Sequence, residues 1–319
     1  MNAIDNEIGL DAGLHARLSS ADPGVRRIAI MDLLDADDYE QVEIHLLSAL
    51  DDEDSTVRAE AAAALEGFET PEVIRALLRV LADHDEEVGK AAAQSLAELK
   101  DPAAGVQLIA ALDGAEGSAR AAIFRALREL RVPAAQGPAL DALTDSVAEV
   151  REAAVGVLGY LKAAAAVLPI ARLATTDPEP LVRRISVGAL GFAREMAEVL
   201  PALVTALRDE YWPVREEAAT TLGKLGVPAG IPYLIAAMGD DYWQVRIKAA
   251  RSLGKMRSKE ALPALSEALF HEVSNLRKEA AVALGEIGDV RAVPVLEQAL
   301  KDPDPDVRKL AGLALSRIG

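Results

Sequence analysis

The sequence predicts an all-α protein, an α-solenoid of about ten helix-pair repeats wound into a right-handed superhelix. Three observations carry this prediction. A Val-Arg dipeptide, or a degenerate copy of it, recurs every 31 or 32 residues along the chain. Each copy holds two segments with helical periodicity. Only eleven of the 319 residues are aromatic, so the core must consist of small aliphatic side chains, which permit close helix packing.

The arginine of the dipeptide marks the start of the second helix of each repeat. In the segments 214–226 and 276–288, apolar or small residues fall at −1, +3, +6, +7 and +10 from this arginine, which forms a helical stripe. A small residue at +8 is expected to let the neighbouring helix approach closely. The regular dipeptides are Val25-Arg26, Val57-Arg58, Val150-Arg151, Val182-Arg183, Val214-Arg215, Val245-Arg246 and Val307-Arg308, and the weaker copies are Val88-Gly89, Ala119-Arg120 and Leu276-Arg277.

The first helix of each later repeat carries a proline, which we expect in its opening turn. Proline is tolerated there because its missing N–H would have no partner within the helix. These prolines are Pro138, Pro169, Pro201, Pro232, Pro263 and Pro294.

The turn between the two helices carries an aspartate six residues before the arginine position. A carboxylate there is expected to cap the second helix and to meet the arginine of the same or the adjacent repeat. A row of Asp and Arg would then follow one edge of the stack, with a structural rather than a catalytic role. The aspartates are Asp52, Asp83, Asp145, Asp177, Asp209, Asp240 and Asp302.

We predict a single array over residues 1–319. Residues 1–21 form an opening helix, repeats 1–4 (22–144) are degenerate and acidic, and repeats 5–10 (145–319) are regular. The formal net charge is −17, unevenly spread: residues 1–160 carry 13 basic and 31 acidic side chains, and residues 161–319 carry 21 and 20. An acidic first half argues against binding of nucleic acid and would attract a basic partner.

The pattern D-x-x-x-x-V-R-x-x-A-x-x-A-L-G-x-I resembles a HEAT-repeat array, in particular the short HEAT-like repeats of the phycobilisome-lyase type. The resemblance covers the chain from about Asp22 onward. It implies an α-solenoid whose second helices line the concave side, and it leaves function open because the family has many roles. Some HEAT-like enzymes bind two irons through His-Glu pairs after the repeat arginine, but the corresponding pairs here contain no histidine.

An aromatic pair recurs in two neighbouring repeats, as DEYWPVR and DDYWQVR. Tryptophan three residues before the arginine is common in this family, so Trp212 and Trp243 have a structural role over the interhelix turn. Tyr211 and Tyr242 are less expected. Four rings in a row, about 10 Å apart between repeats at ordinary helix spacing, would form a ledge for a peptide. We expect both roles, packing first and binding second.

The positions +1, +5 and +9 after the arginine predict what the concave groove presents. Gly156 with Tyr160, and Gly188 with Phe192, are expected to form an aromatic dent, unless a bend buries them on one another. Basic residues in the neighbouring repeats suit an acidic peptide or a carboxylate ligand, or are simply a solvated face. The candidate basic residues are Arg125, Arg184, Lys224, Arg251 and Lys255.

We find no catalytic motif, no metal-binding pattern and no cofactor signature. Cysteine is absent, and the four histidines are scattered without the spacing of a zinc site. No segment is long enough to span a membrane. The sequence therefore predicts a soluble cytoplasmic protein that is not an enzyme.

The function predicted from these features is a protein-binding scaffold that holds another protein or peptide in its concave groove. The alternative, implied by the resemblance to phycobilin lyases, is an assembly subunit that binds a tetrapyrrole together with a partner. Leu310, Leu313 and Leu315 at the C-terminal repeat make self-association an open alternative.

Overall fold

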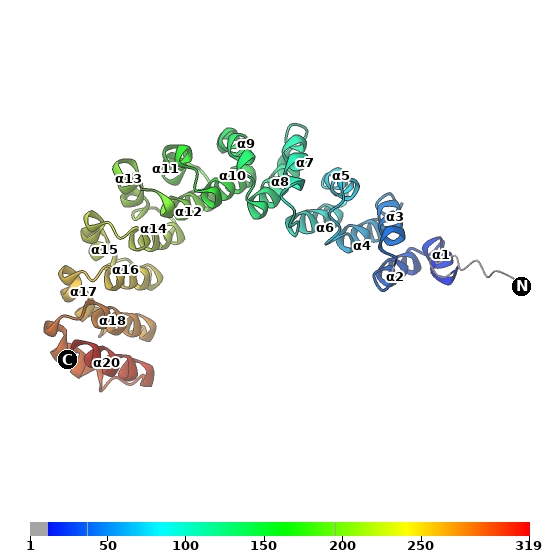
Figure 1. Ribbon diagram of the computed structural model, residues 1–319. Helices are drawn as coiled ribbons and strands as arrows, with labels where there is room; N and C mark the ends of the chain where they lie inside the picture. The colour runs from blue at the N-terminus through cyan, green and yellow to red at the C-terminus, as the bar shows by residue number, and fades with distance from the viewer. Residues whose placement is uncertain (1–11, 37, 195) are drawn as a thin grey trace, which may run out of the picture. The chain divides into compact units, whose positions relative to one another are not determined.

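The computed structural model describes residues 12–36, 38–194 and 196–319, and they form an all-helical protein without strands (Figure 1). The α-solenoid predicted from the repeat is therefore confirmed. The chain divides into two compact units, Met1–Leu161 (unit 1) and Lys162–Gly319 (unit 2). No helix in the described part of the chain has the length and apolar character needed to cross a bilayer.

Unit 1 stacks helix pairs in chain order, and its even-numbered helices from α2 to α8 pack on their successors. The short 3₁₀ turns are labelled η. Its elements are α1 (Ala12–Leu18), α2 (Pro23–Leu33), α3 (Tyr39–Ala49), α4 (Ser55–Ala64), α5 (Pro71–Val80), α6 (Glu86–Ala97), α7 (Ala104–Ala111), α8 (Gly117–Leu130), η1 (Pro133–Ala135), α9 (Gln136–Asp141), η2 (Ala142–Thr144) and α10 (Ala148–Leu161).

Unit 2 repeats the same arrangement, with the second helices α12, α14, α16, α18 and α20 packed in series (Figure 1). Its elements are η3 (Ala164–Ala166), α11 (Val167–Thr176), α12 (Pro180–Ala189), η4 (Leu190–Phe192), α13 (Met196–Ala206), α14 (Trp212–Leu225), η5 (Pro228–Gly230), α15 (Ile231–Ala237), α16 (Trp243–Lys255), η6 (Lys259–Ala261), α17 (Leu262–Ala268), α18 (Ser274–Ile287), η7 (Val290–Ala292), α19 (Val293–Ala299) and α20 (Pro305–Ile318).

The core of both units consists almost entirely of Ala, Leu and Val, as the composition predicts. Close approach of the second helices depends on the glycines at position +8. A Cβ on Gly254 would lie 2.8 Å from the Ala283 Cα, and one on Gly285 would lie 2.8 Å from the Ala314 Cβ. These helices therefore pack at a separation that only glycine permits.

The first helices begin as predicted in the last repeats, where Pro232, Pro263 and Pro294 stand in the opening turns of α15, α17 and α19. The prediction is wrong for Pro201, which lies inside α13. That helix starts at Met196, five residues earlier, so the proline removes an N–H from its interior rather than from its first turn.

Candidate functional site

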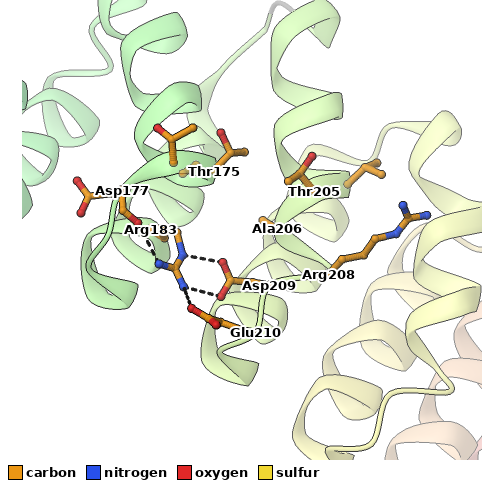
Figure 2. Close-up of a pocket in the computed structure, with 11 residues that line it drawn as sticks. Thr175, Asp177, Arg183, Thr205, Ala206, Arg208, Asp209 and Glu210 are labelled. Atoms are coloured by element: carbon orange, nitrogen blue, oxygen red, sulfur yellow. Dashed lines mark hydrogen bonds and ion pairs between the residues drawn. The ribbon is translucent and has the colours of Figure 1, made fainter.

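Bidentate ion pairs between consecutive repeats form an Asp–Arg ladder, defined by six contacts within the two units. Arg183 Nε donates to Asp209 Oδ2 at 2.7 Å and Nη2 donates to Asp209 Oδ1 at 2.9 Å (Figure 2). The arginine reaches forward by 25 or 26 residues to the turn of the next repeat. The contacts are Arg26–Asp52, Arg58–Asp83, Arg120–Asp145, Arg183–Asp209, Arg215–Asp240 and Arg277–Asp302.

Each ladder aspartate also fixes its own turn. Asp240 Oδ1 accepts the Tyr242 N–H at 2.9 Å while the same carboxylate binds Arg215. Hydrogen bonds from Arg58 hold the pKa of Asp83 below its ordinary value, and Arg277 does the same for the pKa of Asp302. The ladder carboxylates are therefore occupied by structural contacts, as the sequence predicts.

Direct capping of the second helix, in contrast, falls to a different residue. Asp54, Asp85 and Asp304, two positions after the ladder aspartate, accept the N–H groups at the starts of α4, α6 and α20. The predicted cap was therefore displaced by two residues, because the ladder carboxylate turns toward the arginine of the preceding repeat.

The ladder changes at His271, which stands 25 residues after Arg246 in the place of the aspartate. His271 Nδ1 accepts the Val273 N–H at 3.0 Å, so the imidazole keeps the turn. It offers no carboxylate to Arg246, whose Nε instead donates to the carbonyl oxygen of Asp240. Arg246 thus has no carboxylate partner among the described contacts.

The recurring aromatic residues form a ridge in unit 2, defined by Tyr211, Trp212, Tyr242 and Trp243. The rings of Trp212 and Tyr242 stack with their centroids 5.6 Å apart and their planes inclined by 17°. Arg215 adds a cation–π contact, its guanidinium carbon 5.4 Å from the Tyr242 centroid. The rings are closer than the predicted separation of about 10 Å, because Tyr242 leans across to the preceding repeat.

The ridge keeps a large exposed surface. Tyr211, Tyr242 and Trp243 are 39%, 45% and 38% exposed. The tyrosines owe their position to the ladder, since the N–H groups of Tyr211 and Tyr242 each donate to the ladder carboxylate two residues earlier. Exposed aromatic side chains held by a rigid turn are typical anchors of protein interfaces.

A cavity of about 450 Å³ adjoins the ridge in the chain, between the ends of α11 and α13. Figure 2 shows the Arg183–Asp209 pair at its centre and the Arg208 side chain directed away from that pair. Glu210, next to Tyr211, accepts a longer contact of 3.5 Å from Arg183. The Thr175 and Thr205 hydroxyls donate to carbonyls of their own helices. The lining is mainly polar, which suits a hydrated interface rather than an apolar ligand.

The predicted basic residues of unit 2 do not behave alike. Arg184, Lys224, Arg251 and Lys255 are all exposed. Arg251 is engaged, since its Nη2 lies 2.6 Å from Glu279 Oε2. Lys224 covers Gly191, where an added Cβ would lie 2.9 Å from the lysine Nζ.

Lys255 lines a cavity of about 660 Å³ at the ends of α16 and α18, together with Arg257, Arg317 and Glu286. None of these three basic side chains makes a described ion pair. The sequence missed Arg257, because this residue lies outside the +1, +5, +9 pattern and reaches the cavity through a left-handed backbone conformation, φ 51°.

The residues of the predicted aromatic dent lie in both units, and in each unit a neighbouring side chain covers the glycine. A Cβ on Gly156 would meet Arg128 Cδ at 3.3 Å, and one on Gly188 would meet Glu217 Oε1 at 3.0 Å. Burial raises the pKa of Glu217, while the charges of Arg184, Lys248 and Lys224 act in the opposite direction.

The two aromatic residues of the predicted dent have different surroundings. Tyr160 is 45% exposed, and the Arg131 guanidinium lies over its ring at 4.8 Å. Phe192 is half-buried in η4. Juxtaposition of the two glycine–aromatic pairs remains a prediction.

One pairing escaped the sequence analysis. The rings of His15 and His45 meet edge to face, 5.7 Å apart, because α1 and α3 bring them together. Burial lowers the pKa of His45, and the charge of His15 lowers it further. Among the described residues, no group of three or more His, Asp or Glu has the arrangement of a metal site.

The sequence profile that describes HEAT repeats matches the chain in four overlapping stretches, residues 42–128, 106–191, 169–244 and 231–316. A comparison with functionally curated proteins gives no significant match.

Solved structures share the fold at low sequence identity. An engineered protein is 23% identical, with 96% of this chain and 98% of that one covered and a TM-score of 0.55. The YibA protein of E. coli is 20% identical, with 94% and 97% covered and a TM-score of 0.56. Kap95p, described with RanGDP, is 17% identical, with 96% of this chain but 48% of Kap95p covered and a TM-score of 0.57. At these identities the likeness concerns the fold alone.

Proposed function

From the premise that this chain belongs to the HEAT-repeat family, we propose that it is a non-enzymatic scaffold that binds another protein. The observation that carries the proposal is the exposed ridge of Tyr211, Trp212, Tyr242 and Trp243. The chain has only eleven aromatic side chains, yet four of them gather at two adjacent turns. Packing alone would bury such rings rather than expose them.

Charges around the ridge favour a partner with basic side chains. Glu210 and Asp241 flank the aromatic residues and are exposed. A lysine or arginine of the partner would contact both the carboxylates and the faces of the exposed rings. The titles of two structures with this fold name proteins bound to a partner, RanGDP with Kap95p and Nup53p with Kap121p, which supports partner binding as a use of the fold.

Within this proposal the partner continues from the ridge into the groove of second helices, where Arg184, Lys224 and Lys255 are exposed. Lys255 with Arg257 and Arg317 would receive acidic groups of the partner at the 660 Å³ cavity. The ridge provides the apolar anchors, and the basic residues orient the bound segment.

Affinity capture with the purified protein tests this function. We expect Tyr242→Ala combined with Trp243→Ala to deplete the captured partner at least about tenfold, the effect of losing one hot-spot residue. Tyr233→Ala is the matched control, since Tyr233 is also about 38% exposed in unit 2 but lies on a first helix. An equal partner list for the ridge variant and the control would reject the ridge as the binding surface.

The finer predictions rest on sequence resemblance and stay proposals. They are the phycobilisome-lyase type of repeat, a tetrapyrrole ligand, a cytoplasmic location and self-association through the C-terminal repeat. Leu313 on α20 is 48% exposed, which suits the last of these. Absorbance during titration with a bilin tests the ligand, cell fractionation tests the location, and sedimentation tests self-association.

A further inference from the structure

A cavity of about 570 Å³ lies in unit 1, between the turn that precedes α6 and the start of α8. Its lining includes Asp83 and His84 in the turn, Gly89 on α6, and Glu116 and Ser118 at the start of α8. Arg125 and Glu149 also contribute.

The cavity lies where one contact of the Asp–Arg ladder is missing. In the third repeat, Gly89 occupies the position of the arginine, and 25 residues later Gly114 occupies the position of the aspartate. Both partners of one contact are thus absent together. The neighbouring contacts Arg58–Asp83 and Arg120–Asp145 are present on either side.

The other repeats show what this position normally holds. The ladder guanidinium uses Nη1 to donate to carbonyl oxygens of its own turn, six and five residues earlier. Arg58 Nη1 lies 2.9 Å from the Asp52 oxygen and 3.3 Å from the Glu53 oxygen. The equivalent acceptors in the third repeat are the carbonyl oxygens of Asp83 and His84. Neither receives a donor among the described hydrogen bonds, although both residues line the cavity.

Carboxylates for a cation are also in place. Glu116 directly precedes α8 but makes no side-chain capping hydrogen bond, and it has no described ion pair. Glu149 is likewise exposed and without a described ion pair. Lys90 does not compete for them, because its Nζ is held at 2.8 Å by Glu86 and at 3.0 Å by Glu87.

We propose that this cavity binds an arginine side chain of a partner protein, whose guanidinium takes the place of the missing ladder arginine. The planar guanidinium donates in several directions at once, so it reaches both the turn carbonyls and the Glu116 carboxylate. A lysine ammonium, a point charge, fits this forked set of acceptors less well. Arg125, half-buried and without a described ion pair, contacts a carbonyl or carboxylate of the segment that bears the arginine.

This site belongs to unit 1 and does not depend on the aromatic ridge of unit 2. The test uses the full-length protein alone, so its failure leaves partner capture through the ridge untouched. The probe is N-acetylarginine amide, and N-acetylcitrulline amide is the uncharged isostere. Chemical shifts of the backbone amides are followed by NMR during titration.

We expect the arginine probe to shift saturably the amides of residues 81–90 and 116–119. The citrulline probe leaves them unchanged. Gly89→Arg fills the site from within and weakens binding of the probe at least about tenfold, the effect of losing roughly one charged hydrogen-bond set. Gly89→Ala is the matched control and retains binding, because it adds the Cβ without the guanidinium.

A Cβ at residue 89 would lie 3.0 Å from the Leu81 carbonyl oxygen, so Glu116→Gln provides a second variant that leaves α6 unaltered. We expect it to weaken the probe at least about threefold through loss of the carboxylate charge. Equal binding of arginine and citrulline, unchanged binding by Gly89→Arg, or unchanged binding by Glu116→Gln overturns the proposal.

Discussion

His271→Asp should restore the ladder between the eighth and ninth repeats and stabilise unit 2. The backbone of the turn needs no change, because His271 Nδ1 already accepts the Val273 N–H as a ladder aspartate would. The carbonyl oxygen of residue 271 already accepts Arg277 Nη1 at 2.9 Å. Only the carboxylate for Arg246 is missing.

The magnitude follows from the neighbouring contact. Arg277 and Asp302 pair through two hydrogen bonds of 2.7 and 2.8 Å, with side chains 11% and 8% exposed. Two charge-assisted bonds contribute about 3 kcal/mol or more, but desolvation of the carboxylate offsets much of this. The net gain is about 1–2 kcal/mol, which raises the Tm by about 2–8 °C for a unit of this size.

Urea unfolding and calorimetry at neutral pH measure the gain, and a double-mutant cycle assigns it. In the background of Arg246→Ala, the same substitution should yield no stabilisation, because the new carboxylate has no cation to meet. Hydrogen exchange should show the added protection in α16 and α18. An equal gain with and without Arg246, or no gain at all, would refute the role assigned to the ladder.

Three further predictions concern stability. Asp240→Ala leaves Arg215 without its carboxylate and frees the Tyr242 N–H, so urea titration should show a loss of about 2–3 kcal/mol, below the range for fully buried pairs because the Asp240 side chain keeps 10% exposure. Gly254→Ala forces α16 away from α18 and should cost about 1–3 kcal/mol despite the better helix propensity of alanine; Gly137→Ala, where no atom lies within 4 Å, is the control and should be neutral or stabilising. The lowered pKa of His45 means that the unfolded chain binds a proton more readily, so stability should fall as the pH decreases below about 6.5, and His45→Gln should reduce this dependence in pH-resolved unfolding. An unchanged pH profile in that variant would exclude His45 as its source.

The repeat made the ladder and the core predictable, because a regular spacing fixes which residues recur at equivalent places. Asp209 and Arg183 could be matched from sequence alone, as could the close approach at Gly254. The displaced caps were not predictable in the same way. They follow from the direction in which each carboxylate turns, and that direction depends on an arginine in the neighbouring repeat.

The candidate surface was predictable in residue type and less so in geometry. The sequence identified Tyr211 and Tyr242 as unexpected, but their side-chain torsions decide whether the rings stack, and no periodicity encodes them. The His15–His45 pair and the cavity beside Gly89 arise from packing between elements. In the second case the informative signal was the simultaneous absence of Asp and Arg at positions 25 residues apart, which is visible once the repeats are aligned.

The ladder accepts two spans, since Arg26–Asp52 and Arg183–Asp209 are separated by 26 residues and Arg58–Asp83 by 25. The additional residue is absorbed between the second helix of one repeat and the turn of the next, while the ionic contact keeps the same geometry. Insertions and deletions on that stretch are therefore tolerated without loss of register at this edge. Evolution can remodel the first helices and their loops while the ion-paired turns keep successive repeats aligned.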